Sequence, residues 1–107
     1  MRQQIATKSG TNNTGGSNVL PMDLYISPFN VGFGVVVAGT VTYTVQHTFD
    51  NPQTTASPTW FPHPTIFAKS DNQDGNYAFP VAAIRVLVTA STGAYSVTMT
   101  VIQAGVA

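Results

Sequence analysis

The sequence predicts an all-β domain, because apolar and polar residues alternate along most of the chain. In VTYTVQHTF (41–49) every second residue is apolar or aromatic, and AIRVLVTA (83–90) and AYSVTMTVIQ (94–103) repeat this pattern. β-Branched residues dominate these runs, and no segment shows the 3.6-residue apolar spacing of an amphipathic helix. The predicted fold class is a single small antiparallel β-sandwich or jelly roll of roughly six to eight strands, with an extended N-terminal arm.

The elements follow in chain order. Residues 1–18, MRQQIATKSGTNNTGGSN, form the predicted arm, which is too polar to fold alone and should become ordered on a partner. The sandwich domain is predicted over 19–107. Its first two strands are expected at 19–27 and 30–38, where Pro21 and two glycines indicate an edge or a bulge.

Turn signals separate the later strands. Gly39 is expected to end one strand, and Ser91-Thr92-Gly93 to form a hairpin between the last two. The segment 71–76, DNQDGN, is predicted to be a polar turn before Tyr77.

Composition limits the partners. The 107 residues suit one domain, Cys is absent, and charged residues make up only 7%, with a formal net charge of zero. Four scattered cations cannot supply the phosphate contacts of a nucleic-acid-binding protein. The first ten residues contain no apolar core of a secretory signal, and the run at 31–39 is about half a membrane span, so we expect no membrane association. A net charge of zero instead favours a protein docked in an assembly, although plain extracellular β domains have the same composition.

No group of residues in the sequence matches a complete catalytic or metal-binding motif. The segment 70–75 resembles the start of a calcium loop, but Val81 stands where the closing acid is needed. Ser57 or Thr59 could be combined with His63 and Asp50, but no nucleophile motif frames them. We therefore predict no catalytic residue, no cofactor and no metal.

The segment TWFPHPT (59–65) concentrates Trp60, Phe61 and His63 between prolines that favour extended backbone. Three uses remain open: the rings cap one end of the sandwich, they face outward as interface anchors, or they form a platform for a sugar. A second signal is a set of threonines that would give a polar face without charges: Thr40, Thr42, Thr44, Thr48, Thr98 and Thr100. Plain β-propensity explains these threonines equally well.

Four segments, VTYTVQHTFDNP, TWFPHP, DGNYAFPVAAIRVLVT and SVTMTVIQAG, resemble a group of small proteins encoded among the virion structural genes of tailed bacteriophages. The resemblance covers about Val41 to Gly105 and leaves out the arm. This chain has Pro62 where the pattern often has an acid.

The resemblance implies a non-enzymatic virion protein on the capsid exterior, made in the cytoplasm of the host bacterium. We expect a decoration or cement protein that binds the major capsid protein and forms a homo-oligomer, with strand edges or the arm adding to capsid subunits. A head-fibre or tail component and a glycan-binding module (Trp60, His63 and Tyr77 touching the sugar) are the alternatives. The predicted partner-binding residues are Arg2, Gln3, Gln4, Ile5, Trp60, Phe61, His63, Phe67 and Tyr77.

Overall fold

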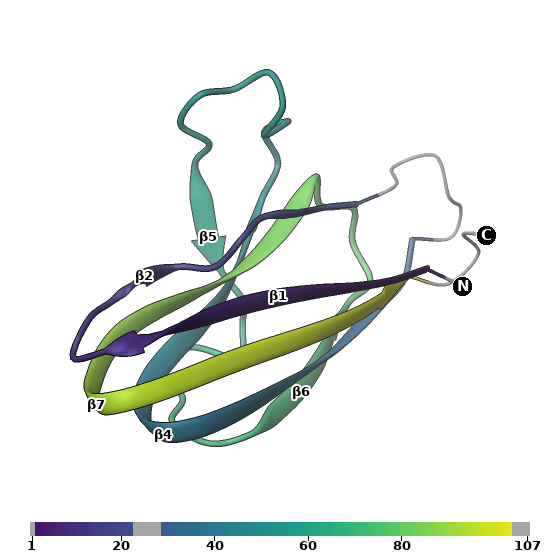
Figure 1. Cartoon of the computed structure of the whole chain (residues 1–107). Helices are drawn as coiled ribbons and strands as arrows, with labels where there is room; N and C mark the ends of the chain where they lie inside the picture. Colours follow the sequence, from purple (N-terminus) through teal and green to yellow (C-terminus); the bar gives the residue numbers. More distant parts are fainter. Residues whose placement is uncertain (1, 23–28, 104–107) are drawn as a thin grey trace.

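The protein is described by a computed structural model that covers residues 2–22 and 29–103, apart from the side chain of Arg2. These residues form one antiparallel sheet of seven strands and contain no helix (Figure 1). The prediction of an all-β antiparallel sandwich is confirmed. The strands are β1 (Arg2–Thr11), β2 (Gly15–Gly16), β3 (Leu20–Pro21), β4 (Val31–Thr48), β5 (Trp60–Pro62), β6 (Gln73–Tyr77) and β7 (Ala83–Gln103).

A bent two-stranded ribbon is the frame of the molecule. Strands β4 and β7 pair along almost their whole length, and Figure 1 shows both turning back at the same end of the sheet. The backbone there needs glycine, because Gly39 and Gly93 have φ angles of 86° and 73°. A Cβ at Gly39 would also collide with the carbonyl oxygen of Ala94. The ribbon therefore folds over onto itself and creates two layers.

Both layers have the same strand order. In the first, the second half of β7 lies between β1 and the first half of β4, whose other edge pairs with β6. In the second, the first half of β7 lies between β2–β3 and the second half of β4, whose other edge pairs with β5. The sandwich consequently has two different lateral sides. We call the β1 and β2–β3 side the polar side, and the β5 and β6 side the aromatic side.

The core lies between the layers and is built from alternate residues of each strand. The alternation seen in the sequence is thus the inward–outward alternation of the pleat. The buried residues that follow this alternation are Val31, Phe33, Val35, Val41, Tyr43, Val45 and His47 in β4, and Ile84, Val86, Val88, Tyr95, Val97, Met99, Val101 and Gln103 in β7. Thr44, Thr48 and Ala83 are buried as well, outside this alternation.

Two predicted chain reversals are wrong. The segment 91–93 is not a hairpin, and Gly39 does not end a strand, because both lie inside continuous strands. Their backbone conformations fold β7 and β4 over from one layer into the other without a hairpin, since β4 and β7 stay paired with each other on both sides of the bend. A glycine with positive φ gives the same sequence signal for a bend as for a turn.

The N-terminal arm is extended, but its binding partner lies within the same chain. Residues 2–11 pair with β7 over ten residues, and Ala6 is completely buried. The expectation that this segment orders only on docking is therefore corrected. Main-chain pairing and polar side chains stabilise a segment that has little apolar surface to bury.

Two smaller predictions also change. The polar turn at 71–76 is shorter than predicted, because Gln73–Tyr77 extends along β4 as strand β6. Of the strand expected at 19–27, Leu20–Pro21 pairs with β7, and residues 23–28 lie outside the described part.

Candidate interaction site

Three exposed phenylalanines gather on the aromatic side. Phe49 follows β4, Phe61 lies in β5 and Phe79 follows β6, and their exposed fractions are 58%, 44% and 41%. The ring of Phe49 lies 5.8 Å from that of Phe61 and 6.4 Å from that of Phe79, measured between centroids. We call these residues the phenylalanine triad. Its rings come from both layers of the sandwich, so the fold itself brings them together.

The His47 imidazole lies beneath the triad. It is only 5% exposed, and its centroid is 5.4 Å from Phe49, 6.0 Å from Phe61 and 5.4 Å from Phe79. The ring is stacked on Phe61 and meets the other two edge-on. His47 therefore supports all three exposed rings from below.

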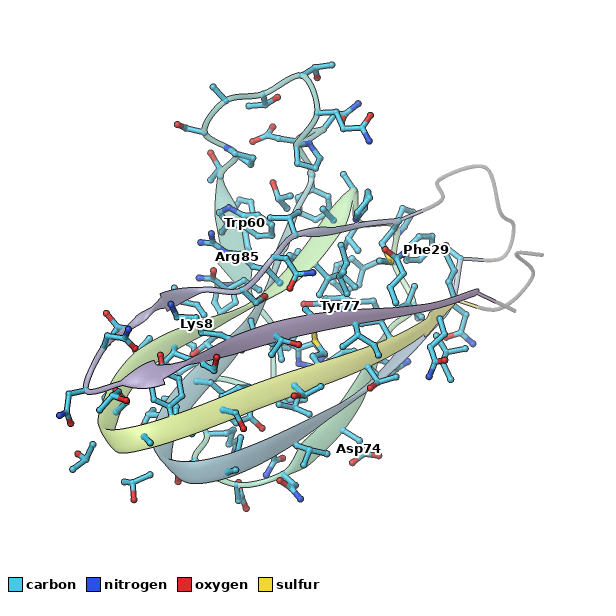
Figure 2. The ribbon with its side chains drawn as sticks, in the orientation of Figure 1. Lys8, Phe29, Trp60, Asp74, Tyr77 and Arg85 are labelled. Carbon is cyan, nitrogen blue, oxygen red and sulfur yellow. The ribbon has the colours of Figure 1, made fainter. Side chains whose placement is uncertain are left out.

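A hydrogen bond ties His47 to the opposite layer. Its Nδ1 lies 2.9 Å from the hydroxyl of Tyr77, which is completely buried inside the sandwich (Figure 2). Burial lowers the pKa of His47, and the nearby imidazole of His63 lowers it further. Burial also raises the pKa of the Tyr77 hydroxyl. The support of the triad is thus a pair of uncharged rings at neutral pH.

His63 has a structural role next to this pair. Its Nε2 lies 3.0 Å from the carbonyl oxygen of Asn76, which can only accept, so Nε2 donates. Its Nδ1 then accepts from the backbone N–H groups of Thr65 and Ile66, both at 3.2 Å. The imidazole thereby fixes the segment after β5 against β6.

The TWFPHPT segment uses its rings in three different ways. Adjacent residues of an extended strand point to opposite faces, so Phe61 joins the triad while Trp60 turns to the outer face of the second layer. There the Trp60 ring lies against the guanidinium of Arg85, 4.2 Å from Cζ to the ring centroid (Figure 2). His63 is buried. One segment thus contributes Phe61 to the triad, Trp60 to the outer face of the second layer and His63 to the buried interior.

The other predicted partner-binding residues do not join this cluster. Gln3 and Ile5 project from the outer face of β1, whereas the Gln4 side chain donates to the carbonyl oxygen of Pro21, 3.0 Å away. Arg2 pairs with Gln103 through the backbone of β1. Phe67 is 61% exposed and makes no ring contact with the triad.

Sequence reasoning missed Phe49, Phe79 and His47 as site residues. Phe49 and His47 continue the inward-facing row of a strand, and this pattern made them core candidates. Phe79 lies between strands without any periodic signal. The cluster forms because β5 and β6 both pair with β4, and nothing in the local sequence encodes that arrangement.

The predicted threonine face is in fact two faces. Thr98 and Thr100 lie on the outside of the first layer, while Thr40 and Thr42 lie on the outside of the second. Thr44 and Thr48 are buried, at 4% and 0% exposure. The outer face of the first layer carries no charge on β1, β4 or β7, where its residues are Gln3, Ile5, Thr7, Ser9, Gly32, Gly34, Val36, Ala38, Ser96, Thr98, Thr100 and Ile102.

The imagined catalytic group does not assemble. Asp50 accepts the backbone N–H of Thr59 at 2.8 Å and closes the loop that projects between β4 and β5 (Figure 1). His63 uses both ring nitrogens for other partners. Across residues 2–22 and 29–103, no three His, Asp, Glu or Cys side chains group as metal ligands do, and no helix is long and apolar enough to span a membrane.

Comparison of the chain with known proteins gives no match to a protein-family model, a curated protein or a solved structure.

Proposed function

We propose that this chain is a non-enzymatic structural protein of a tailed-bacteriophage virion, which binds the major capsid protein and stabilises the capsid lattice. The observation that supports docking on another protein is the phenylalanine triad, and the assignment to a phage capsid follows from the resemblance of residues 41–105 to small virion proteins. Its three half-exposed rings form a contiguous apolar patch on a domain with almost no charge. Such patches on small domains mark contacts with other proteins, and large rigid rings are efficient anchors because few side-chain rotations are lost on binding.

The support beneath the triad suits a docking site. The three rings contact a buried imidazole that is itself bonded to Tyr77, so they are held before a partner arrives. Preorganised contacts lose less conformational entropy on binding. Many copies on a lattice would further multiply a moderate affinity of each site.

The glycan-binding alternative loses its proposed residues. Tyr77 is completely buried and His63 is 6% exposed, so neither can stack on a sugar. One face of the Trp60 ring is taken by Arg85. These three side chains do not share a surface.

Co-sedimentation with empty, expanded capsids of the phage tests the proposal. The wild-type protein should bind saturably, and the double variant Phe49→Ser/Phe79→Ser should bind at least about tenfold more weakly, since two anchor rings are removed. Because both rings are half-exposed, the variant should stay folded, which near-ultraviolet circular dichroism would verify.

Phe67→Ser is the matched comparison, because it makes the same substitution at an exposed ring outside the triad. It should bind like the wild type. If Phe67→Ser lost binding while the double variant kept it, the triad would not be the anchor. If the wild-type protein did not bind capsids at all, the proposed function would be wrong. Deleting the arm is a poor test, since it removes β1 from the sheet.

A further inference from the structure

The guanidinium of Arg85 is held in place by three strands. Its Nε donates to Oε1 of Gln46 on β4 at 2.9 Å, and its Cζ lies 4.2 Å from the centroid of the Trp60 ring on β5. On β2, a Cβ at Gly16 would lie 3.1 Å from Nη1, so the missing side chain leaves the space that the guanidinium occupies. A long, flexible side chain is thereby given one orientation.

This charge has no counterion in the part of the chain that the structure describes. Arg85 makes no ion pair there, and Nε is the only guanidinium nitrogen with a hydrogen bond to protein. The side chain is nevertheless half-buried, and this burial lowers its pKa. A partly desolvated charge without a counterion costs free energy that a bound anion would offset.

We propose that Arg85 is a binding site for a carboxylate, supplied by an aspartate or glutamate side chain of the protein on which this chain docks. The two Nη groups form the planar fork that matches the two oxygens of a carboxylate. The groups that hold the guanidinium, Trp60, Gln46 and Gly16, are all neutral, so one carboxylate balances the single positive charge of the site. The partner's identity rests on the proposed function, but the carboxylate site itself does not.

Arginine, and not merely a positive charge, is required at position 85. Lysine has no Nε–H for Gln46 and no planar group to stack on Trp60, so it cannot hold the same geometry. A general attraction of anions to positive charge would survive Arg85→Lys, whereas a fixed two-pronged site would not.

Nuclear magnetic resonance of the arginine Nε–H signals tests the site with sodium acetate as the probe. The chain has two arginines, so the Arg85 signal is the one that disappears in Arg85→Lys and remains in the matched control Arg2→Lys. With acetate, the signals of Arg85 and of the Trp60 indole N–H should shift saturably, with a dissociation constant in the millimolar range expected for one ion pair. Sodium chloride at equal ionic strength should give no saturable shift. Equal shifts in both salts would overturn the proposal.

Two variants test the preorganisation. Gln46→Ala and Trp60→Leu each remove one support of the guanidinium and should weaken acetate binding several-fold at unchanged charge. Unchanged binding in Gln46→Ala would contradict the geometry, whatever the folding of Trp60→Leu.

The capsid assay separates this inference from the proposed function. Saturable acetate binding without capsid binding would support the carboxylate site and reject the capsid as the partner. Capsid binding without acetate binding would support the proposed function and reject the carboxylate site at Arg85.

Discussion

The two lateral sides of the sandwich are closed in different ways. On the aromatic side, rings from β4, β5 and β6 pack on one another across the gap between the layers. On the polar side, single side chains form hydrogen bonds to the facing strand. The amide of Asn18 donates to the carbonyl oxygen of Ile5 at 3.1 Å and accepts the N–H of Thr7 at 2.9 Å. Asn13 accepts the Tyr95 hydroxyl at 2.7 Å.

This difference indicates that the two sides contribute differently to the stability of the fold and to the position of β1. Burying large rings stabilises a fold roughly in proportion to the apolar area removed from water. Hydrogen bonds at an exposed edge replace bonds to water, so each contributes little net free energy, but each requires one geometry. The aromatic side should therefore supply most of the stability and offer a surface to a partner, while the polar side fixes the position of β1.

The sharpest test of this comparison is Tyr77→Ala on the aromatic side. The variant removes a completely buried ring that contacts His47, His63 and Phe33, and it should lower the free energy of unfolding by about 3–5 kcal/mol. Urea denaturation measures this loss. Tyr77→Phe keeps the ring and loses only the bond to His47, so it should cost about 1 kcal/mol. Equal losses in both variants would show that the hydroxyl, and not the ring, stabilises this side.

A smaller loss is expected from Asn18→Ala on the polar side. It should cost about 1 kcal/mol or less, because Asn18 is exposed and water can replace its bonds. Hydrogen exchange at the Thr7 amide should nevertheless become much faster. Asn18→Asp keeps an oxygen acceptor for Thr7 and should preserve that protection. A loss as large as that of Tyr77→Ala would mean that the two sides do not differ in stability.

The smallest effect is a dependence on pH that arises from His47, on the aromatic side. The folded pKa of His47 is below its ordinary value of 6.5, so below that pH the unfolded chain binds more protons than the folded one. The contribution of His47 to the free energy of unfolding should be fully present above pH 6.5 and should decrease as the pH falls below that value. Denaturant titrations between pH 8 and 5 measure the slope. His47→Asn, which can still bond to Tyr77, should flatten it, and an unchanged slope would assign the effect to another group.

The fold was more predictable from sequence than the site, for a physical reason. Period-two alternation is a local consequence of the pleat, so residues 41–49 and 94–103 predict strands correctly. The bends at Gly39 and Gly93 were mistaken for strand ends because positive φ is common to both. The arm 1–18 is too polar for the sequence to predict a fold for it, because its partners, such as Tyr95 and Ser91 for Asn13, lie about eighty residues away along the chain.

For the candidate site, one member of the triad was found and two were not. Phe61 drew attention because it lies beside Trp60 and between prolines. Phe49 and Phe79 are thirty residues apart, and only the pairing of β4 with both β5 and β6 brings them together. The alternation in residues 83–90 predicts the neighbours of Arg85 as core residues, but it does not predict which residues contact the Arg85 side chain.

The strand order also has a consequence for how the protein is made. β7 is the last of the seven strands in the described residues, yet it is the one to which β1, β2, β3 and β4 all bind. During synthesis these four strands leave the ribosome before their common partner exists. Among the described strands, β4 can pair early with β5 and β6, but its edge toward β7 keeps open backbone groups until β7 has been made. Most of the strand pairing involves β7 and therefore forms late. Because long-range pairing is slow, the chain is most exposed to aggregation before this step.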